Sequence, residues 1–104
     1  MRVPWGPTSF RFGKHVKWVR RGIDIDAFCP SIAPGTGTPS HGGFLYYEVL
    51  ELLQAAAKRH DIVGIDLVEV APDYDRSGST SILAAQILLN FLGFIFHARA
   101  EREA

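Results

Sequence analysis

The stretch Gly22-Ile-Asp-Ile-Asp-Ala-Phe-Cys-Pro30 decides how this chain is interpreted, together with the loop Ser31-Ile-Ala-Pro-Gly-Thr-Gly-Thr-Pro39 that follows it. Asp24 and Asp26 stand two residues apart at the expected end of a β-strand, so both carboxylates should face the same side. Two neighbouring carboxylates repel each other unless a cation or a shared proton neutralises them. The Pro, Gly and Thr residues of the loop then lead the backbone away. This pattern predicts a divalent metal site at the carboxyl end of a strand.

The elements predicted around this stretch alternate between strand and helix. Apolar and β-branched residues predict strands over 17–26 and 62–70. An apolar stripe at helical spacing predicts a helix over 44–60, and a final helix is predicted from 79 to about 103. We therefore expect an α/β fold of the order β-loop-α-β-loop-α, in which the functional loops follow the carboxyl ends of parallel strands.

The final helix raises two questions of its own. Ser79 or Thr80 is the predicted cap at its start, because a hydroxyl can accept a hydrogen bond from a free backbone N–H there. Its apolar run over 82–98 is interrupted by Gln86 and Asn90. We therefore predict a buried helix and no membrane span.

The first residues differ in character from the rest of the chain. Residues 1–15 carry turn-forming Pro and Gly without any period, so an irregular arm is predicted, and we divide the chain into residues 1–21 and residues 22–104. Residues 1–23 hold six basic residues and no acid, whereas the remainder has a net charge of −6. An acidic body favours cationic ligands over nucleic acid, although the basic and aromatic arm leaves a nucleic-acid role open.

Length and cysteine content limit the class of protein. A chain of 104 residues makes at most one domain. Cys29 is the only cysteine, so no internal disulfide can form and a cytoplasmic location is the expectation. No apolar run follows the basic start, so no signal peptide is predicted.

A third carboxylate is predicted beside the aspartate pair. Glu69 lies at the end of the second predicted strand, just before the Ala71-Pro72 turn. If the two strands are parallel, Glu69 reaches the same edge of the sheet as Asp24 and Asp26. Asp66 lies inside that strand, and a hydrogen-bonded structural role is predicted for it.

Two separate blocks resemble the ureohydrolase family of arginase, agmatinase and guanidinobutyrase, and agmatinase most of all. The first comprises Asp24-Ile-Asp26, Pro30, the loop Ala33-Pro-Gly-Thr-Gly-Thr-Pro39 and Gly42-Gly43; the second comprises Gly64-Ile-Asp-Leu-Val-Glu-Val-Ala-Pro72 and Asp73-Tyr-Asp75. The resemblance covers residues 22–104. It implies the C-terminal part of a three-layer αβα parallel-sheet fold, in a family whose members form homo-oligomers.

The same resemblance implies the chemistry. It assigns Asp24 as a bridge between two Mn²⁺ ions and Asp26 as a ligand of one of them, and hard oxygen ligands suit this metal. Two such ions can share a hydroxide acidic enough to attack a guanidinium carbon. Glu69 matches the glutamate that pairs with the substrate guanidinium, and Thr38 matches a threonine beside it. The implied reaction converts agmatine or a similar guanidino compound to an amine and urea.

The departures from the family pattern predict an incomplete site. The family takes its other ligands from earlier His-x-Asp motifs, and residues 1–21 contain none. His15 is isolated, and His41 is interpreted as a polar loop residue. Cys29 stands where the family usually has an aspartate that steadies the loop, and nothing beside it in sequence marks it as a nucleophile. Two carboxylates cannot satisfy two ions that need about six ligands each. We therefore expect a truncated chain that binds metal weakly and is inactive alone.

Two alternatives follow from the same residues. The missing ligands and the apolar final helix suggest a non-catalytic fragment that acts only by packing with a partner or an oligomer. The segment Gly35-Thr-Gly-Thr38 could also cradle a phosphate, but it lacks the Gly-Lys-Ser/Thr ending of a P-loop. The nearby aspartates would repel such a ligand.

Overall fold

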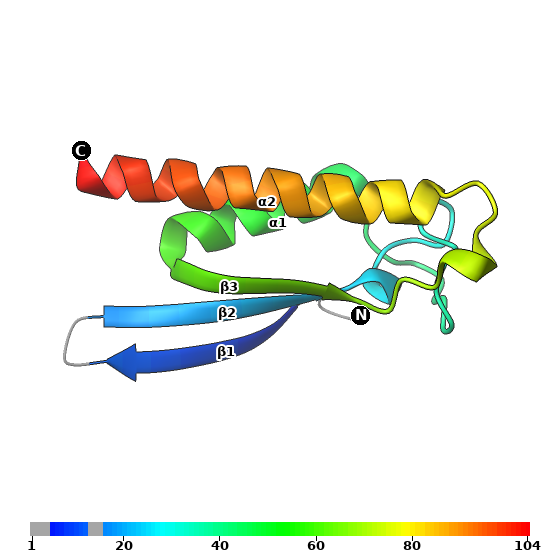
Figure 1. Ribbon diagram of the computed structural model, residues 1–104, viewed down its shortest axis with the longest axis horizontal. Helices are drawn as coiled ribbons and strands as arrows, with labels where there is room; N and C mark the ends of the chain where they lie inside the picture. The colour runs from blue at the N-terminus through cyan, green and yellow to red at the C-terminus, as the bar shows by residue number, and fades with distance from the viewer. Residues whose placement is uncertain (1–4, 13–15) are drawn as a thin grey trace.

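Three strands form one sheet, and both long helices cover the same face of it (Figure 1). The computed structural model describes the backbone of residues 5–12 and 16–21, and the backbone and side chains of residues 22–104. The strands are β1 (Trp5–Phe12), β2 (Val16–Asp24) and β3 (Asp61–Val68), in the spatial order β1-β2-β3. Helix α1 spans Tyr46–Arg59 and helix α2 spans Ser79–Glu103.

Strands β2 and β3 pair in parallel, which confirms the predicted arrangement. The register places Asp24, the last residue of β2, opposite Val68, the last residue of β3. In Figure 1 both strands run toward the end of the molecule where the loops gather. We call this region the loop end; it comprises residues 24–44 and 69–78. The two chain segments that carry the candidate carboxylates therefore leave the sheet side by side.

The prediction of an irregular arm was wrong for residues 5–12. They form β1, which pairs antiparallel with β2 from Trp5 opposite Ile23 to Phe12 opposite Val16. The pairing partner lies only a few residues further along the chain, but a count of Pro and Gly in residues 1–15 does not reveal it. The predicted arm also includes residues 1–4 and 13–15, His15 among them, which lie outside the described residues.

The strand that carries the aspartates ends at Asp24 and not at Asp26 as predicted. A short 3₁₀ turn, η1 (Ile25–Ala27), follows directly. The Asp26 N–H donates to Asp24 Oδ1 at 3.1 Å, and the Phe28 N–H donates to the Ile25 carbonyl at 3.2 Å. An aspartate side chain that accepts a bond from the backbone two residues on favours a turn over an extended strand.

The helices agree with the predicted ranges to within two residues. Helix α1 begins after Leu45, whose N–H donates to Glu48 Oε1 at 2.8 Å. Helix α2 begins after a second 3₁₀ turn, η2 (Pro72–Tyr74), and its cap position is Gly78 with φ +74°. The prediction that Ser79 or Thr80 caps α2 was therefore wrong.

The core lies between the helices and the sheet. Its fully buried large apolar side chains come from β2, β3, α1, α2 and the turn after β2: Ile23, Ile25, Phe28, Val49, Leu53, Ile62, Ile87 and Phe91. On α2 the buried positions recur every three or four residues (Leu83, Ala84, Ile87, Phe91, Ile95 and Ala98). This spacing is that of one helix face.

The other face of α2 is also apolar, and it is exposed. Ile82, Leu89, Leu92 and Phe96 are each at least two-fifths accessible. The prediction of a buried helix therefore holds for one face only. By length and composition α2 could cross a membrane, with a mean hydropathy of 1.7 in its most apolar window. Core helices of soluble proteins pass the same test, so the finding alone identifies no membrane protein.

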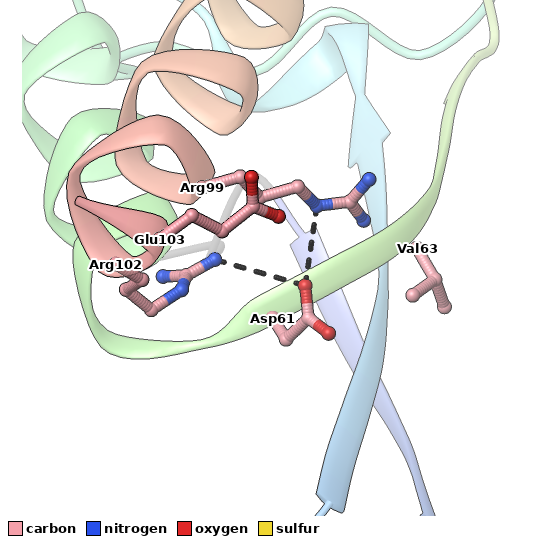
Figure 2. A pocket seen from close by; sticks show the side chains of 5 residues that line it. All are labelled: Asp61, Val63, Arg99, Arg102 and Glu103. Atoms are coloured by element: carbon pink, nitrogen blue, oxygen red, sulfur yellow. Dashed lines mark hydrogen bonds and ion pairs between the residues drawn. The ribbon is translucent and has the colours of Figure 1, made fainter.

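The end of the molecule opposite the loop end is held by charged contacts (Figure 2). Asp61 starts β3, and its Oδ1 lies 3.2 Å from Arg99 Nε and 3.7 Å from Arg102 Nη2. Arg99 Nη2 also donates to the Ile62 carbonyl at 2.6 Å. Asp61, Arg99 and Arg102, together with Val63 and Glu103, line an open hollow of about 420 Å³. We call Asp61, Arg99 and Arg102 the arginine end.

Candidate functional site

The candidate site lies at the loop end, where β2 and β3 finish. Asp24 is the last residue of β2, and its partner Val68 immediately precedes Glu69. The parallel register therefore brings Asp24 and Glu69 to the same level of the sheet. The turn η1 then adds Asp26 two residues after Asp24. Three predicted site residues thus meet at one edge, although a turn and not strand alternation places Asp26.

The fourth predicted residue joins this group from the long loop. Thr38 Oγ1 donates to Asp26 Oδ2 at 2.9 Å, across twelve residues of sequence. Asp26 is 3% exposed, whereas Thr38 is exposed. The hydroxyl therefore links an accessible loop to a buried carboxylate and orients it.

Negative charge accumulates at this edge of the sheet. The pKa of Asp24 is raised, first because the carboxyl is desolvated, and further because the Asp26 and Glu69 carboxylates lie nearby. The N–H of Asp26 opposes this effect by donating to Asp24. In the part of the chain that the structure describes, no ion pair joins Asp24 or Glu69 to a cationic side chain. A cation bound here would relieve the repulsion.

Glu69 has a strained backbone. Its φ is +72°, and it is the one described residue other than glycine with a positive φ. The left-handed region costs a side-chain-bearing residue about 1–2 kcal/mol, and glycine is the usual occupant. A glutamate in this conformation projects its carboxylate where a regular strand would not. Strain of this kind is concentrated at functional sites.

The loop that carries Thr38 is fixed at its far end by the backbone. The Phe44 N–H donates to the Ala27 carbonyl at 2.9 Å, and the Cys29 N–H donates to the Phe44 carbonyl at 2.8 Å. Gly43 lies against this junction, and a Cβ there would come within 2.5 Å of the Phe28 carbonyl carbon. Only glycine allows the chain to return so closely to η1.

A buried aspartate that the sequence interpretation assigned no role organises the other end of the loop. Asp75 Oδ2 accepts the Thr80 N–H at 2.7 Å, and Asp75 Oδ1 accepts the Ser77 hydroxyl at 2.6 Å. Hydrogen bonds from Ser77 and then from Thr80 lower the pKa of Asp75 to about 2. Thr80 Oγ1 in turn accepts the Gly35 N–H at 2.9 Å. The spacing of an aspartate ahead of Ser and Thr at a helix start was the available signal.

The remaining sequence candidates lie around this group. Asp66 lies within β3 opposite Gly22, and a Cβ on that glycine would come within 2.9 Å of its Oδ1. The Ser31 hydroxyl donates to Cys29 Sγ at 3.0 Å, and hydrogen bonds from Ser31 lower the pKa of the thiol. His41 is exposed in the loop.

The donor set meets part of the requirement of a metal centre. Asp24 and Asp26 offer carboxylate oxygens, which suit Mn²⁺. Among the described residues, however, no group of three or more His, Cys, Asp or Glu side chains is arranged to hold an ion. Two octahedral ions need about twelve donor positions between them. The described residues therefore do not fit a complete binuclear centre.

Comparisons with known proteins show which family this chain belongs to. A sequence model described as the arginase family matches residues 9–93. The proclavaminate amidinohydrolase of Streptomyces clavuligerus is 49% identical over 80 residues, which are 77% of this chain and 25% of that protein. The mitochondrial agmatinase of Gallus gallus is 49% identical over 70 residues, which are 67% of this chain and 20% of that protein.

Solved structures agree with this assignment. The structure of the Streptomyces clavuligerus enzyme matches 74% of this chain with a TM-score of 0.68 and 47% identity. The matched part is 25% of that enzyme's chain, so this chain spans about a quarter of the length of such relatives. Both sequence and fold agree over most of the 104 residues. The chain belongs to the arginase family.

Proposed function

We propose that this chain carries the aspartate pair and the substrate-binding glutamate of an agmatinase-like ureohydrolase. The reaction is the Mn²⁺-dependent hydrolysis of agmatine or a similar guanidino compound to an amine and urea. Asp24 and Asp26 are the metal ligands of this proposal, and Glu69 and Thr38 are its substrate-side residues. A homo-oligomeric, cytoplasmic enzyme without nucleic-acid or membrane partners belongs to the same proposal.

The observation that carries the proposal is the arrangement of charge at the loop end. Three carboxylates meet where the pKa of Asp24 is raised, and one of them, Glu69, is held on strained backbone. Such an arrangement suits a cationic ligand, and a guanidinium can donate two parallel hydrogen bonds to one carboxylate. The family membership and the relative named agmatinase support the same substrate class.

The incomplete donor set limits what the chain does alone. Asp24 and Asp26 supply two carboxylates, and the other ligands of a binuclear centre are not found among the described residues. We therefore propose that the 104-residue chain is inactive until further ligands are supplied. The role left to its own residues is to hold Asp26 through Thr38 and to present Glu69 to the guanidinium.

A chimeric enzyme tests the proposal. Residues 22–104 would replace the matching region of the Streptomyces clavuligerus relative, which supplies the rest of the family fold. With Mn²⁺, we expect urea from agmatine or from another small guanidino compound. The Asp24→Asn chimera should lose more than about 100-fold in rate, because Asn keeps the bond from the Asp26 N–H but not the charge. If no guanidino compound yields urea, the activity assignment is wrong.

A second candidate function rests on the exposed apolar surface. Leu89 and Phe96 are 71% and 63% accessible on the outer face of α2. Strand β3 lies at one edge of the described sheet, and its Val63 and Val68 are exposed. Unpaired edges and apolar patches favour association. The chain would then be a non-catalytic unit that acts by packing with a partner or an oligomer. Size-exclusion chromatography with a Mn²⁺ titration separates the two, since a monomer that binds two Mn²⁺ ions tightly contradicts this second function.

A further inference from the structure

The Asp75 carboxylate is buried, ionisable and not used by the proposed chemistry. It is 9% exposed, and Thr80 beside it is fully buried. Asp75 accepts hydrogen bonds from the Ser77 N–H at 3.2 Å, from the Ser77 hydroxyl and from the Thr80 N–H. A buried carboxylate with this many donors is stable as an anion. In sequence Asp75 follows Glu69 by six residues but lies far from Asp24, Asp26 and Thr38.

The hydrogen bonds around Asp75 extend beyond the start of α2. Thr80 Oγ1 accepts the Gly35 N–H at 2.9 Å, and this bond joins residues 45 positions apart. The carbonyl of the same glycine accepts the Ala71 N–H at 2.7 Å. Gly35 therefore bonds α2 through its N–H and the segment after β3 through its carbonyl. Both bonds are buried or short, so neither is readily replaced by water.

Gly35 has no room for another residue. A Cβ there would lie 2.9 Å from Asp75 Cβ and 2.9 Å from Thr80 Oγ1. The backbone is thus pressed directly against the Asp75 and Thr80 side chains. A displacement of either side chain should therefore also move the Gly35 backbone, because the three residues are closely packed.

The two segments that meet at Gly35 both lead to residues of the candidate site. Thr38, which holds Asp26, follows Gly35 by three residues. Glu69, on its strained backbone, precedes Ala71 by two residues. We propose that Asp75 is a positioning residue: through Thr80 and Gly35 it fixes the Thr38 loop, which is hydrogen-bonded to Asp26, against the Glu69 segment and so sets the spacing between Asp26 and Glu69. The inference rests on the proposed function for the roles of Asp26 and Glu69.

The test uses the 104-residue chain and amide hydrogen exchange followed by NMR. Thr80→Val removes the hydroxyl that accepts the Gly35 N–H but keeps the backbone N–H that donates to Asp75. We expect the Gly35 and Ala71 amides to exchange roughly fivefold to tenfold faster, the equivalent of about one net hydrogen bond. Thr80→Ser should restore the original rates. Ser81→Ala on the same helix is the matched control and should change neither amide.

Two outcomes would overturn the inference. One is that Thr80→Val leaves both amides as protected as in the original chain. The other is that exchange quickens equally at Leu53 in the core, which would show general destabilisation and no local coupling. Asp75→Asn provides an independent variant. It weakens the hydrogen bonds that residue 75 accepts from Ser77 and Thr80, but it leaves the Thr80 side chain unchanged.

A paramagnetic measurement separates this inference from the proposed function. Added Mn²⁺ should broaden the amide signals of Asp26, Thr38 and Glu69 together in the original chain. In Thr80→Val, broadening should persist at Asp26 and weaken at Thr38 and Glu69. No broadening at Asp24 or Asp26 in the original chain would contradict the metal role of the proposed function. The exchange rates of Gly35 and Ala71 would still decide the role of Asp75.

Discussion

Carboxylates at the two ends of this small sheet have opposite electrostatic surroundings. At the arginine end, Asp61 lies between Arg99 and Arg102, so its charge is neutralised within the protein (Figure 2). At the loop end, Asp24 lies near two more carboxylates, and its pKa is raised. A protein selected only for stability would pair or remove such charges. The difference indicates that the arginine end serves the fold, and it is consistent with the ligand site proposed for the loop end.

The backbone shows the same contrast. The loop end holds Glu69 at positive φ and needs glycine at Gly43 and Gly35 for close approach. On α2, which leads to the arginine end, a Cβ at Gly93 would meet nothing within 4 Å. Strain and tight packing are thus concentrated where the candidate site lies. Each of the following predictions alters one side of this comparison.

The largest effect is expected from Gly43→Ala. The new Cβ would lie 2.5 Å from the Phe28 carbonyl carbon and 2.6 Å from the Ala27 carbonyl oxygen, and both are backbone atoms that cannot turn aside. We expect a loss of about 3 kcal/mol in the free energy of unfolding, at the upper end of overpacking effects. The matched control is Gly93→Ala, which should stabilise the chain by up to about 1 kcal/mol through helix propensity. Urea denaturation measures both, and equal effects at the two sites would refute the contrast in packing.

An acid titration comes next. The pKa of Asp75 is about 2, below the ordinary value of 3.8, because the fold donates hydrogen bonds to the anion. The unfolded chain therefore binds more protons between about pH 4 and pH 2, and stability falls as the pH is lowered through that window. In Asp75→Asn this contribution disappears, so the variant should lose less stability between pH 4 and pH 2 while being less stable at pH 7. An unchanged slope in thermal unfolding over this range would contradict the prediction.

Much of the fold and of the candidate site could be predicted from the sequence, but not all of it. The β-branched run over 62–70 and the apolar stripe over 44–60 predicted β3 and α1, because burial on sheet and helix faces leaves a period in the chain. Asp24, Asp26 and Glu69 were predicted to reach one edge of the sheet, and the parallel register brings the ends of β2 and β3 together there. A hydrogen bond to Asp26 places Thr38 in the same group, whereas its predicted position beside Glu69 stays a prediction. Local pattern and overall fold agree at these points.

The features that the sequence did not predict (the end of β2, the role of Asp75 and strand β1) share a physical cause. The ends of elements here are set by single side-chain hydrogen bonds, such as the bond from the Asp26 N–H to Asp24, which ends β2 two residues early. The local spacing marked Asp75 as a helix-start residue, but its link to the Thr38 loop runs through the bond between Thr80 and Gly35, which are 45 residues apart. Strand β1 was missed because its pairing with β2 outweighs the turn-forming residues of that segment. Contacts of this kind have no periodic signature in a sequence.

A substitution at Glu69 should change the free energy of unfolding by less than Gly43→Ala does, and in the opposite direction. Glu69→Gly should relieve the left-handed strain at φ +72°, although glycine also gains freedom in the unfolded chain. We expect a net stabilisation of about 0.5–1 kcal/mol, whereas Glu69→Gln keeps the strain and should leave stability nearly unchanged. Both variants should abolish guanidinium pairing in the chimeric enzyme. If Glu69→Gly is the less stable of the two, the backbone at this position is not strained.

The smallest effect is expected at the arginine end, from Asp61→Asn. The Asp61 and Arg99 side chains are 39% and 37% exposed, so water already screens much of their attraction. Asn also keeps an oxygen that can accept from Arg99 Nε. We expect a loss of about 0.5 kcal/mol at low salt that shrinks further at 1 M NaCl, where the Debye length is about 3 Å. Asp24→Asn is the informative counterpart, because removing a charge that lies near two other carboxylates should raise stability by a few tenths of a kcal/mol and lower Mn²⁺ affinity. Two aspartates at opposite ends of one sheet would then respond with opposite signs, and a loss of stability in both variants would contradict the division of this molecule into a structural end and a ligand end.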